Sequence, residues 1–422
     1  MNVAIVMDCG STSTRVIAVS DRGVFLSQAA FPSAPARRRV VGRDLVVWDL
    51  DSIWRNLSRA SRRVVRDIDR SAIQAVTVTT FGADGAPVDH AGRLTFPVIS
   101  WQSRGTEEQA LAVRRALDPA EIFRITGYQV IHFNTLLKLM WLRKYAPAAL
   151  RRARCFLMMP GLLSFKLSGS PSIDPTMAST TMAMDLARNA WSKRLLALAG
   201  LDPSFFPRWV EPGEVIGRVT ARASRQTGIP AGVPVIAAGH DTQFAPIGAG
   251  AGQDEMLLST GTWEILLVRT PKFRPSPRSL QSGVLFERDA LKGLFNPQLL
   301  MMGSGVLEWV RRSFFPGLDR AANPYARLIR DARKVRPGSN GLLVLPSFVR
   351  GTGPTAMYGT LGTVLGLKLD TSPPEIYRAT LEGLCFQLRD ALEILSRATG
   401  LTPRTLRVVG GGSRNALWNQ IR

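Results

Sequence analysis

The same pattern begins both halves of this chain: an apolar strand, a turn of glycine and hydroxyl residues, and a second apolar strand. The first copy covers residues 3–19, with its turn at 8–14, and the second covers 256–268, with its turn at 259–262. Short runs of branched apolar residues predict strands, and Gly, Ser and Thr between them predict a tight turn. The two copies lie much further apart than the period of a solenoid, which is about 20–50 residues. The repeat therefore predicts two duplicated α/β domains that face each other.

The length of the chain supports the same division. A single hydrophobic core stops growing at about 250–300 residues, and this chain has 422. The composition changes near residue 230, where Pro and Gly lead into the small-residue segment 245–252, either a closely packed helix or a flexible joint. We therefore expect one domain over residues 1–245 and a second over residues 246–422.

Hydrophobic periodicity places further elements around these repeats. A period of 3.6 residues predicts helices, and short apolar runs predict strands. The expected strands are 23–28, 45–48, 74–80 and 405–409, and the expected helices are 51–69, 106–117, 134–145, 192–199, 303–314, 373–398 and 413–422.

The strong positive charge says little about function. The formal charge is +22, but the basic residues are mostly scattered arginines, and residues 37–39 form the only run of three. Arginines that are interspersed in apolar-periodic segments are typical of solvated helix faces. No nucleic-acid module is recognisable in the sequence, so we expect no nucleic-acid partner.

Cysteine use and hydropathy point to the cytoplasm. Cys9, Cys155 and Cys385 lie far apart without C-x-x-C spacing, which fits a reducing compartment and no zinc site. The N-terminus lacks the pattern of a signal peptide, and no run of about 18 uncharged apolar residues occurs. We therefore expect a cytoplasmic protein with no membrane partner. No pattern encodes the oligomeric state, and a homodimer stays open.

The two glycine-hydroxyl turns suit phosphate groups. Glycine lets successive backbone N–H groups point at one anion, and hydroxyls add donors. The first turn offers Asp8, Gly10, Ser11, Thr12 and Ser13, and Asp8 is placed to hold a hydrated Mg²⁺. Plain hairpin turns are the alternative for each copy alone. The second turn offers Thr260, Gly261 and Thr262. Two matched turns, one in each domain, favour binding of a polyphosphate.

Asp241 follows Gly239 and His240 at a predicted strand end. A carboxylate there could accept a proton from a substrate hydroxyl that attacks a phosphoryl group. It could also cap the following helix, and one side chain can do both. His240 is either a satisfied buried histidine or a donor to a sugar hydroxyl.

Three further features are ambiguous when each is taken alone. Asp84 lies in a glycine-flanked turn and either stabilises that turn or binds a polyol through its two oxygens. Trp101 is either a core residue or an apolar surface for a sugar. The segment Gly410, Gly411 and Gly412 either lets a flat ring approach the backbone or makes a tight strand–helix turn.

Taken together, these segments resemble the FGGY family of carbohydrate kinases, within the actin/Hsp70-like ATPase superfamily. The resemblance covers essentially the whole chain and is carried by seven blocks: MDCGSTSTR at 7–15, TTFGADG at 79–85, ISWQSRGT at 99–106, AGHDTQFA at 238–245, LLSTGTWEIL at 257–266, LEGLCFQL at 381–388 and VVGGGSRNALWNQI at 408–421.

The resemblance implies two ribonuclease-H-like domains with the sugar and MgATP in the cleft between them. Asp241 matches the family's catalytic base, and the turns at 8–14 and 259–262 match its phosphate-binding segments. Residues 410–412 match the adenosine segment, and Asp84, Trp101 and His240 occupy sugar-facing positions. The blocks are most similar to those of members that convert L-fuculose to L-fuculose 1-phosphate. L-rhamnulose, D-ribulose and D-xylulose are the alternative substrates.

Family members continue past the last block, whereas this sequence stops at Arg422. We therefore expect the second domain to be truncated at its C-terminus. This leaves a non-catalytic protein that binds sugar or nucleotide as the alternative to an active kinase.

Overall fold

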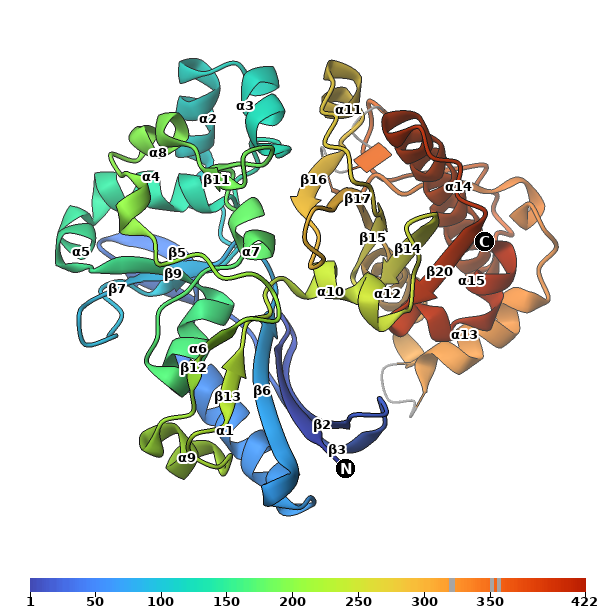
Figure 1. The fold of residues 1–422 in the computed structure, drawn as a ribbon. Helices are drawn as coiled ribbons and strands as arrows, with labels where there is room; N and C mark the ends of the chain where they lie inside the picture. Colours follow the sequence, from blue (N-terminus) through green and yellow to red (C-terminus); the bar gives the residue numbers. More distant parts are fainter. Residues whose placement is uncertain (319–322, 350–352, 355–357) are drawn as a thin grey trace. The chain divides into compact units, whose positions relative to one another are not determined.

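The computed structural model describes residues 1–318, 323–349, 353–354 and 358–422. The chain divides into two compact units, whose elements are labelled in Figure 1. Unit 1 contains residues 1–244 and 287–294, and unit 2 contains residues 245–286 and 295–422. The short segment 287–294 belongs to unit 1, although the sequence suggested a continuous first domain.

Unit 1 is built on a six-stranded sheet in the order β12-β13-β6-β1-β2-β3. Strand β1 pairs antiparallel with β2, and β2 with β3, while β6 runs parallel to β1 on its other side. The bounds are β1 (Val3–Cys9), β2 (Ser13–Ser20), β3 (Phe25–Pro32), β6 (Ile73–Thr80), β12 (Val215–Arg218) and β13 (Pro234–Ile236).

Alternation of side chains explains how this sheet packs. Every second residue of β1 is buried, because successive side chains point to opposite faces of a strand. Helix α1 (Leu50–Arg66) packs its apolar side, including Ile53, Leu57 and Val64, into the same core. Asp49 caps this helix, because its side chain accepts a hydrogen bond from the backbone N–H of Ser52.

The other strands of unit 1 form three smaller, separate sheets, and the unit also contains further helices. The remaining strands are β4 (Ala36–Val40), β5 (Arg43–Trp48), β7 (Gly85–Val88), β8 (Val98–Ile99), β9 (Cys155–Met158), β10 (Met184–Asp185) and β11 (Ala190–Trp191). The remaining helices are α2 (Glu107–Ala116), α3 (Pro119–Thr126), α4 (Thr135–Tyr145), α5 (Pro147–Arg152), α6 (Met159–Ser168), α7 (Pro175–Ser179), α8 (Lys193–Leu198) and α9 (Ala221–Thr227). Helix α10 (Asp241–Gly248) begins in unit 1 and ends in unit 2.

Unit 2 contains a five-stranded sheet in the order β16-β17-β15-β14-β20. Its strands are β14 (Glu255–Thr260), β15 (Trp263–Val268), β16 (Leu285–Arg288), β17 (Phe295–Met302) and β20 (Thr405–Val409). A separate hairpin consists of β18 (Leu343–Leu345) and β19 (Thr363–Leu365). The helices are α11 (Pro277–Gln281), α12 (Ser304–Phe314), α13 (Pro324–Arg333), α14 (Pro373–Thr399) and α15 (Ala416–Ile421).

The repeat seen in the sequence is confirmed as a repeat of topology. In unit 2, β14 pairs antiparallel with β15, β15 with β17, and β20 runs parallel to β14. The strands β1, β2, β3 and β6 have the same order and directions in unit 1. The small-residue segment 245–252 is partly the end of helix α10, which contains Pro246.

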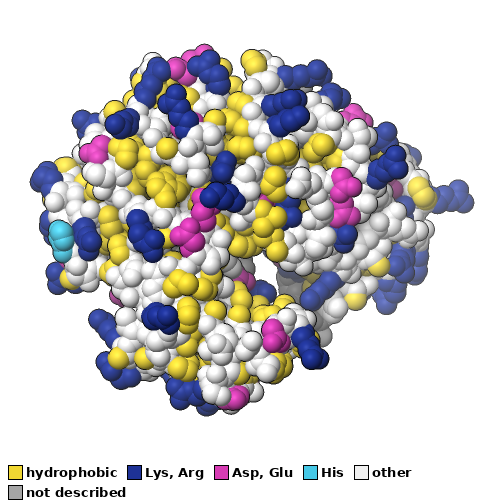
Figure 2. All heavy atoms as spheres, in the orientation of Figure 1, with side chains coloured by type: hydrophobic (Ala, Val, Ile, Leu, Met, Phe, Trp, Pro, Cys, Tyr) yellow, Lys and Arg dark blue, Asp and Glu magenta, His cyan; other side chains and the backbone are white. Residues whose placement is uncertain are grey.

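Figure 2 shows Lys and Arg side chains spread over the visible face and interspersed with other residues. The part of the chain that the structure describes has no helix that is both long and apolar enough to span a bilayer.

Candidate active site

The carboxyl ends of two neighbouring parallel strands bring the first candidate residues together in unit 1. Asp8 lies near the end of β1, directly opposite Thr79 of β6. Beyond β6, the Thr80 N–H donates to the Gly239 carbonyl at 3.0 Å, and Thr80 forms a parallel bridge with His240. The carboxyl edge of a parallel sheet is where α/β proteins commonly bind ligands. His240 and Asp241 therefore lie at the same edge as Asp8.

Helix α7 and its N-cap residue Asp174 hold the backbone before Asp241 in place. The hydroxyl of Thr176 accepts a hydrogen bond from the His240 N–H at 2.9 Å, and Asp174 in turn accepts from Thr176. Gly239 packs so closely here that an added Cβ would lie 2.2 Å from Asp174 Oδ1 and from Thr176 Oγ1. Only glycine fits at this position without displacing the segment that carries His240 and Asp241.

A buried carboxylate that the sequence did not single out organises the histidine. The side chain of Glu287, which is only 1% exposed, accepts hydrogen bonds from His240 Nδ1 at 2.8 Å, Gln243 Nε2 at 2.6 Å and Tyr128 Oη at 2.8 Å. The opposite ring nitrogen, His240 Nε2, lies 3.6 Å from Asp241 Oδ1. Glu287 thus fixes the ring so that its other nitrogen faces the candidate base.

These contacts set the protonation of the pair. Burial lowers the pKa of His240, but the hydrogen-bonded Glu287 carboxylate, together with the charges of Asp241 and Asp174, outweighs burial and raises that pKa to about 9. The imidazole is therefore a cation at neutral pH. Burial raises the pKa of Asp241, and the His240 charge opposes this shift and favours the ionised carboxylate. Asp241 is the more open of the two, since its side chain is 38% exposed and that of His240 is 12% exposed.

Asp8 and Asp241 form a pair of mutually repelling carboxylates. Burial raises the pKa of Asp8 to about 6, the charge of Asp241 adds to this effect, and Arg15 opposes it. Two neighbouring carboxylates of this kind fit a divalent cation such as Mg²⁺, which binds through carboxylate oxygens and its own waters and would offset the repulsion. Among the described residues, no group of three or more His, Cys, Asp or Glu side chains forms a complete metal cage.

The turn after β1 is compact and leaves its hydroxyls available. The Gly10 N–H donates to the Ser13 carbonyl at 2.9 Å, which closes the turn. Within the described part of the chain, the hydroxyls of Ser11, Thr12 and Ser13 form no hydrogen bond with protein groups. The turn can therefore offer three hydroxyl donors to a ligand.

Asp84 lies deeper than the sequence suggested. Its side chain is fully buried, and it forms an ion pair with the buried Lys138. The second carboxylate oxygen, Oδ2, accepts hydrogen bonds from Trp48 Nε1 at 2.7 Å and from the Trp101 N–H at 3.0 Å. In this structure both carboxylate oxygens of Asp84 accept hydrogen bonds from protein groups. Asp84 holds the backbone of Trp101, whose ring is half-buried against the unit 1 core.

The candidate residues of unit 2 also converge. Strand β14 lies beside β20, so that Ser259 is opposite Val409 and the Thr260 hydroxyl donates to the Val409 carbonyl at 2.9 Å. Gly410 has φ of +91°, and an added Cβ there would lie 2.4 Å from the Thr260 carbonyl oxygen. The turn at 260–262 and the segment 410–412 therefore form one glycine-lined surface.

The start of α12 completes this surface. The N–H groups of Gly303 and Ser304 donate to the carbonyls of Thr262 and Gly261 at 3.1 and 3.0 Å. An added Cβ on Gly305 would lie 3.2 Å from the Thr262 side chain. Close backbone approach of this kind is what a flat ring or a phosphate group requires of its binding surface.

The fold of both units matches that of a solved sugar kinase. The crystal structure of xylulose kinase from Rhodospirillum rubrum superposes with a TM-score of 0.87 over 100% of this chain and 84% of that chain, at 24% sequence identity. The expected fold class, two α/β domains with the fold of this sugar kinase, is confirmed.

Sequence comparison then gives the family. The N-terminal domain of the FGGY family of carbohydrate kinases matches residues 3–248, and its C-terminal domain matches residues 256–422. L-fuculokinase from Escherichia coli K12 is 38% identical over 420 residues, which cover 100% of this chain and 86% of that enzyme. Rhamnulokinase from Bacteroides thetaiotaomicron is 28% identical over 98% of this chain and 84% of that enzyme. This chain belongs to the FGGY family of carbohydrate kinases, and the expected enzyme class is thereby confirmed.

The sequence reasoning missed Glu287, Lys138 and Asp174, all of which are buried beside predicted site residues. A weak signal existed for two of them, because Glu287 ends the apolar run 284–286 and Lys138 interrupts the apolar helix 134–145. A charged residue inside an apolar run is seldom buried without a partner. Their partners lie far away in sequence and could not be identified from it.

Proposed function

We propose that this protein transfers the γ-phosphoryl group of ATP to a ketose, with L-fuculose as the first substrate and L-fuculose 1-phosphate as the product. The 38% identity to an L-fuculokinase over the whole chain supports this choice of sugar. L-rhamnulose, D-ribulose and D-xylulose are the alternatives. The observation that carries the proposed chemistry is Asp241, a half-exposed carboxylate at the strand edge with a histidine cation beside it.

In this mechanism Asp241 is the general base. Its carboxylate accepts the proton of the sugar hydroxyl while that oxygen forms a bond to the γ-phosphorus. The bond between the γ-phosphorus and the bridging β–γ oxygen breaks, and ADP leaves with that electron pair. The charge of His240 favours the ionised form of Asp241, because it opposes the effect of burial, which raises the pKa of Asp241.

Asp8 is the residue that we assign to Mg²⁺, because the Asp241 carboxylate disfavours the negative charge of Asp8 and a bound cation would offset that repulsion. Bound Mg²⁺ neutralises phosphate charge and helps to orient the transferred group. The hydroxyls of Ser11, Thr12 and Ser13 bind phosphate oxygens. In unit 2, residues 260–262 bind phosphate, and residues 410–412 bind the adenosine.

For the sugar, we assign direct contact to Trp101 and His240, and a supporting role to Asp84. Asp84 holds the Trp101 backbone through the hydrogen bond at 3.0 Å. The half-buried Trp101 ring offers an apolar face, and Nε2 of His240 offers a donor near Asp241. The sugar hydroxyl is thereby oriented towards its base.

The test is ADP release with MgATP and five acceptors: L-fuculose, L-rhamnulose, D-xylulose, D-ribulose and glycerol. Asp241→Asn should lower kcat by about 10²–10⁴-fold, the usual contribution of a general base, while the affinity for ATP measured by calorimetry stays the same. Asp370→Asn changes an exposed aspartate and serves as the matched control. Normal turnover in Asp241→Asn would refute the assignment of the base.

The same experiment addresses the non-catalytic alternative. If calorimetry detects sugar binding but no acceptor supports ADP release at any ATP concentration, the protein is a binding protein and the proposed activity is wrong. A preference for L-rhamnulose or D-xylulose over L-fuculose would instead correct only the substrate.

A further inference from the structure

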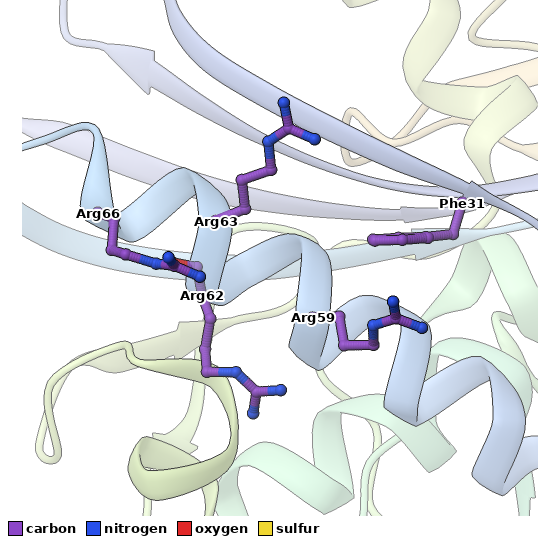
Figure 3. A pocket seen from close by; sticks show the side chains of 5 residues that line it. All are labelled: Phe31, Arg59, Arg62, Arg63 and Arg66. Atoms are coloured by element: carbon purple, nitrogen blue, oxygen red, sulfur yellow. The ribbon is translucent and has the colours of Figure 1, made fainter.

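A row of arginines covers the outward face of α1 in unit 1. Arg59, Arg62, Arg63 and Arg66 are spaced i, i+3, i+4 and i+7, so they lie on one side of the helix. Together with Phe31 of β3 they line a hollow of about 360 Å³. Figure 3 shows Arg59 beside the Phe31 ring, Arg63 extending towards the strands, and Arg62 pointing the other way. This hollow has no part in the proposed phosphoryl transfer.

In the described part of the chain, these four positive charges have no carboxylate partners. Among the described residues none of these arginines forms an ion pair, whereas Arg378 pairs with Glu382 at 2.8 Å and Arg407 with Glu255 at 2.6 Å. Like charges three or four residues apart destabilise a helix. A bound anion would remove this repulsion.

Neutral groups hold the arginine side chains in position. Arg62 Nη1 donates to the Gln226 carbonyl at 2.5 Å, and Arg66 Nε donates to the Arg62 carbonyl at 3.2 Å. The guanidinium carbon of Arg59 lies 4.8 Å from the centre of the Phe31 ring. Each guanidinium has five N–H donors, so most of them remain for a ligand.

The wall of the hollow is continuous with the phosphate turn of β1 and β2. Phe31 is directly opposite Thr14 in the β2–β3 ladder, and the Ser33 N–H donates to the Thr12 carbonyl at 3.0 Å. Asn56 of α1 also donates to the Pro32 carbonyl at 3.3 Å. The helix and the end of β3 are therefore fixed to each other.

The size of the row favours a small ligand over a polymer. At about 1.5 Å per residue, the α-carbons of Arg59 and Arg66 are separated by about 10 Å along the helix. Asp51 and Arg55 precede the row, and Asp67 and Asp69 follow it, so the charge beyond the row is mixed rather than continuously positive. A longer phosphate backbone or a lipid surface would meet these negative charges.

We propose that the hollow formed by Phe31, Arg59, Arg62, Arg63 and Arg66 binds a small organic molecule with two phosphate groups. The guanidinium groups of Arg59 and Arg63, which extend towards the strands, bind the phosphates, and the carbon skeleton packs beside the Phe31 ring. Charge-assisted hydrogen bonds from arginine to phosphate are about twice as strong as neutral ones, which gives the site its preference for phosphate.

The test titrates the full chain with glucose 1,6-bisphosphate, and separately with glucose 6-phosphate, by calorimetry at 0.15 M salt. The variant Arg59→Gln/Arg63→Gln removes two charges from the row. The control Arg37→Gln/Arg39→Gln removes two charges from β4, where neither arginine has a carboxylate partner among the described residues. We expect the first pair to weaken binding of the bisphosphate about tenfold or more, and the control pair to leave it within twofold.

The wild-type protein should also prefer the bisphosphate to the monophosphate by about tenfold. Equal weakening by both variant pairs would overturn the proposal, because net charge alone would then explain binding. Binding of a 20-nucleotide RNA or of anionic vesicles that depends on Arg59 and Arg63, without binding of the bisphosphate, would also overturn it. Turnover with sugar and ATP is measured in parallel and should be unchanged in both pairs, so a failure of the proposed kinase activity is recognised separately.

Discussion

Replacing Glu287 with Gln tests how the charge on His240 arises. Glu287 is 1% exposed and His240 is 12% exposed, so their interaction is little screened by solvent. Burial lowers the pKa of His240, but Glu287, with smaller contributions from Asp241 and Asp174, raises it from 6.5 to about 9. One pKa unit corresponds to about 1.36 kcal/mol, so the raised pKa contributes about 3 kcal/mol to the stability of the folded protein while the imidazole is charged.

In Glu287→Gln the burial of His240 remains, and burial lowers the pKa of an imidazole. We therefore expect the pKa of His240 to fall from about 9 to 6.5 or below. The sequence has only three histidines, His90, His132 and His240, so NMR of histidine-labelled protein can follow each ring. His240→Asn identifies the signal, and Glu214→Gln, at an exposed glutamate of unit 1, is the matched control.

The stability of the protein should follow the same titration. A pKa that is raised by folding contributes stability that is fully present below the unfolded pKa and is lost as the pH rises through the folded pKa. Relative to Glu287→Gln, the wild-type protein should therefore lose about 3 kcal/mol of stability between pH 6.5 and about pH 9. Titratable groups that are the same in both proteins cancel when the stability of Glu287→Gln is subtracted from that of the wild-type protein.

The activity should change in the same direction. Without the His240 charge, the pKa of Asp241 is raised more strongly by burial, so the acidic limb of kcat/KM should move to higher pH in Glu287→Gln. If His240 still titrates near pH 9 in Glu287→Gln, then Asp241 or Asp174 rather than Glu287 raises the pKa of His240, and the reasoning is wrong.

Two further variants test the support of the site. Lys138→Met leaves the Asp84 carboxylate buried without its charged partner and should lower the free energy of unfolding in urea by about 3–5 kcal/mol. Adding Asp84→Asn to the same chain should recover part of this loss. A loss below about 1 kcal/mol in Lys138→Met would show that stability does not depend on the ion pair. Gly239→Ala places a Cβ 2.2 Å from Asp174 and Thr176 and should lower kcat. The control Gly248→Ala, where the Cβ meets no atom within 4 Å, should leave kcat unchanged. Equal kcat values in the two variants would contradict the claim that Gly239 is closely packed.

Much of the fold could be predicted because its signals are local. The apolar runs at 3–7 and 15–19 became β1 and β2, and the periodic segment 51–69 became α1 over residues 50–66. Hydrophobic periodicity depends only on neighbouring residues and on which face is buried. The second copy of the strand–turn–strand pattern, at 256–268, was enough to predict the repeated topology of unit 2.

The candidate site was predictable only in part. Asp8, His240 and Asp241 were identified because each ends an apolar run, and parallel strands bring such ends to one edge. The local pattern of Asp84, a carboxylate between glycines, indicated an exposed turn or ligand contact. Its burial with Lys138 depends on α4, which lies more than fifty residues further along the chain.

The sequence by itself determined the strands, the turns and the residue types available for phosphoryl transfer, because these follow from short-range patterns. Only the tertiary structure decided which of those residues would be charged, buried or open. Glu287 is the clearest case: it follows His240 by 47 positions, yet its carboxylate sets the protonation of that ring. Electrostatic effects of this size require a buried contact at hydrogen-bond distance, and such contacts between distant segments exist only after the chain has folded.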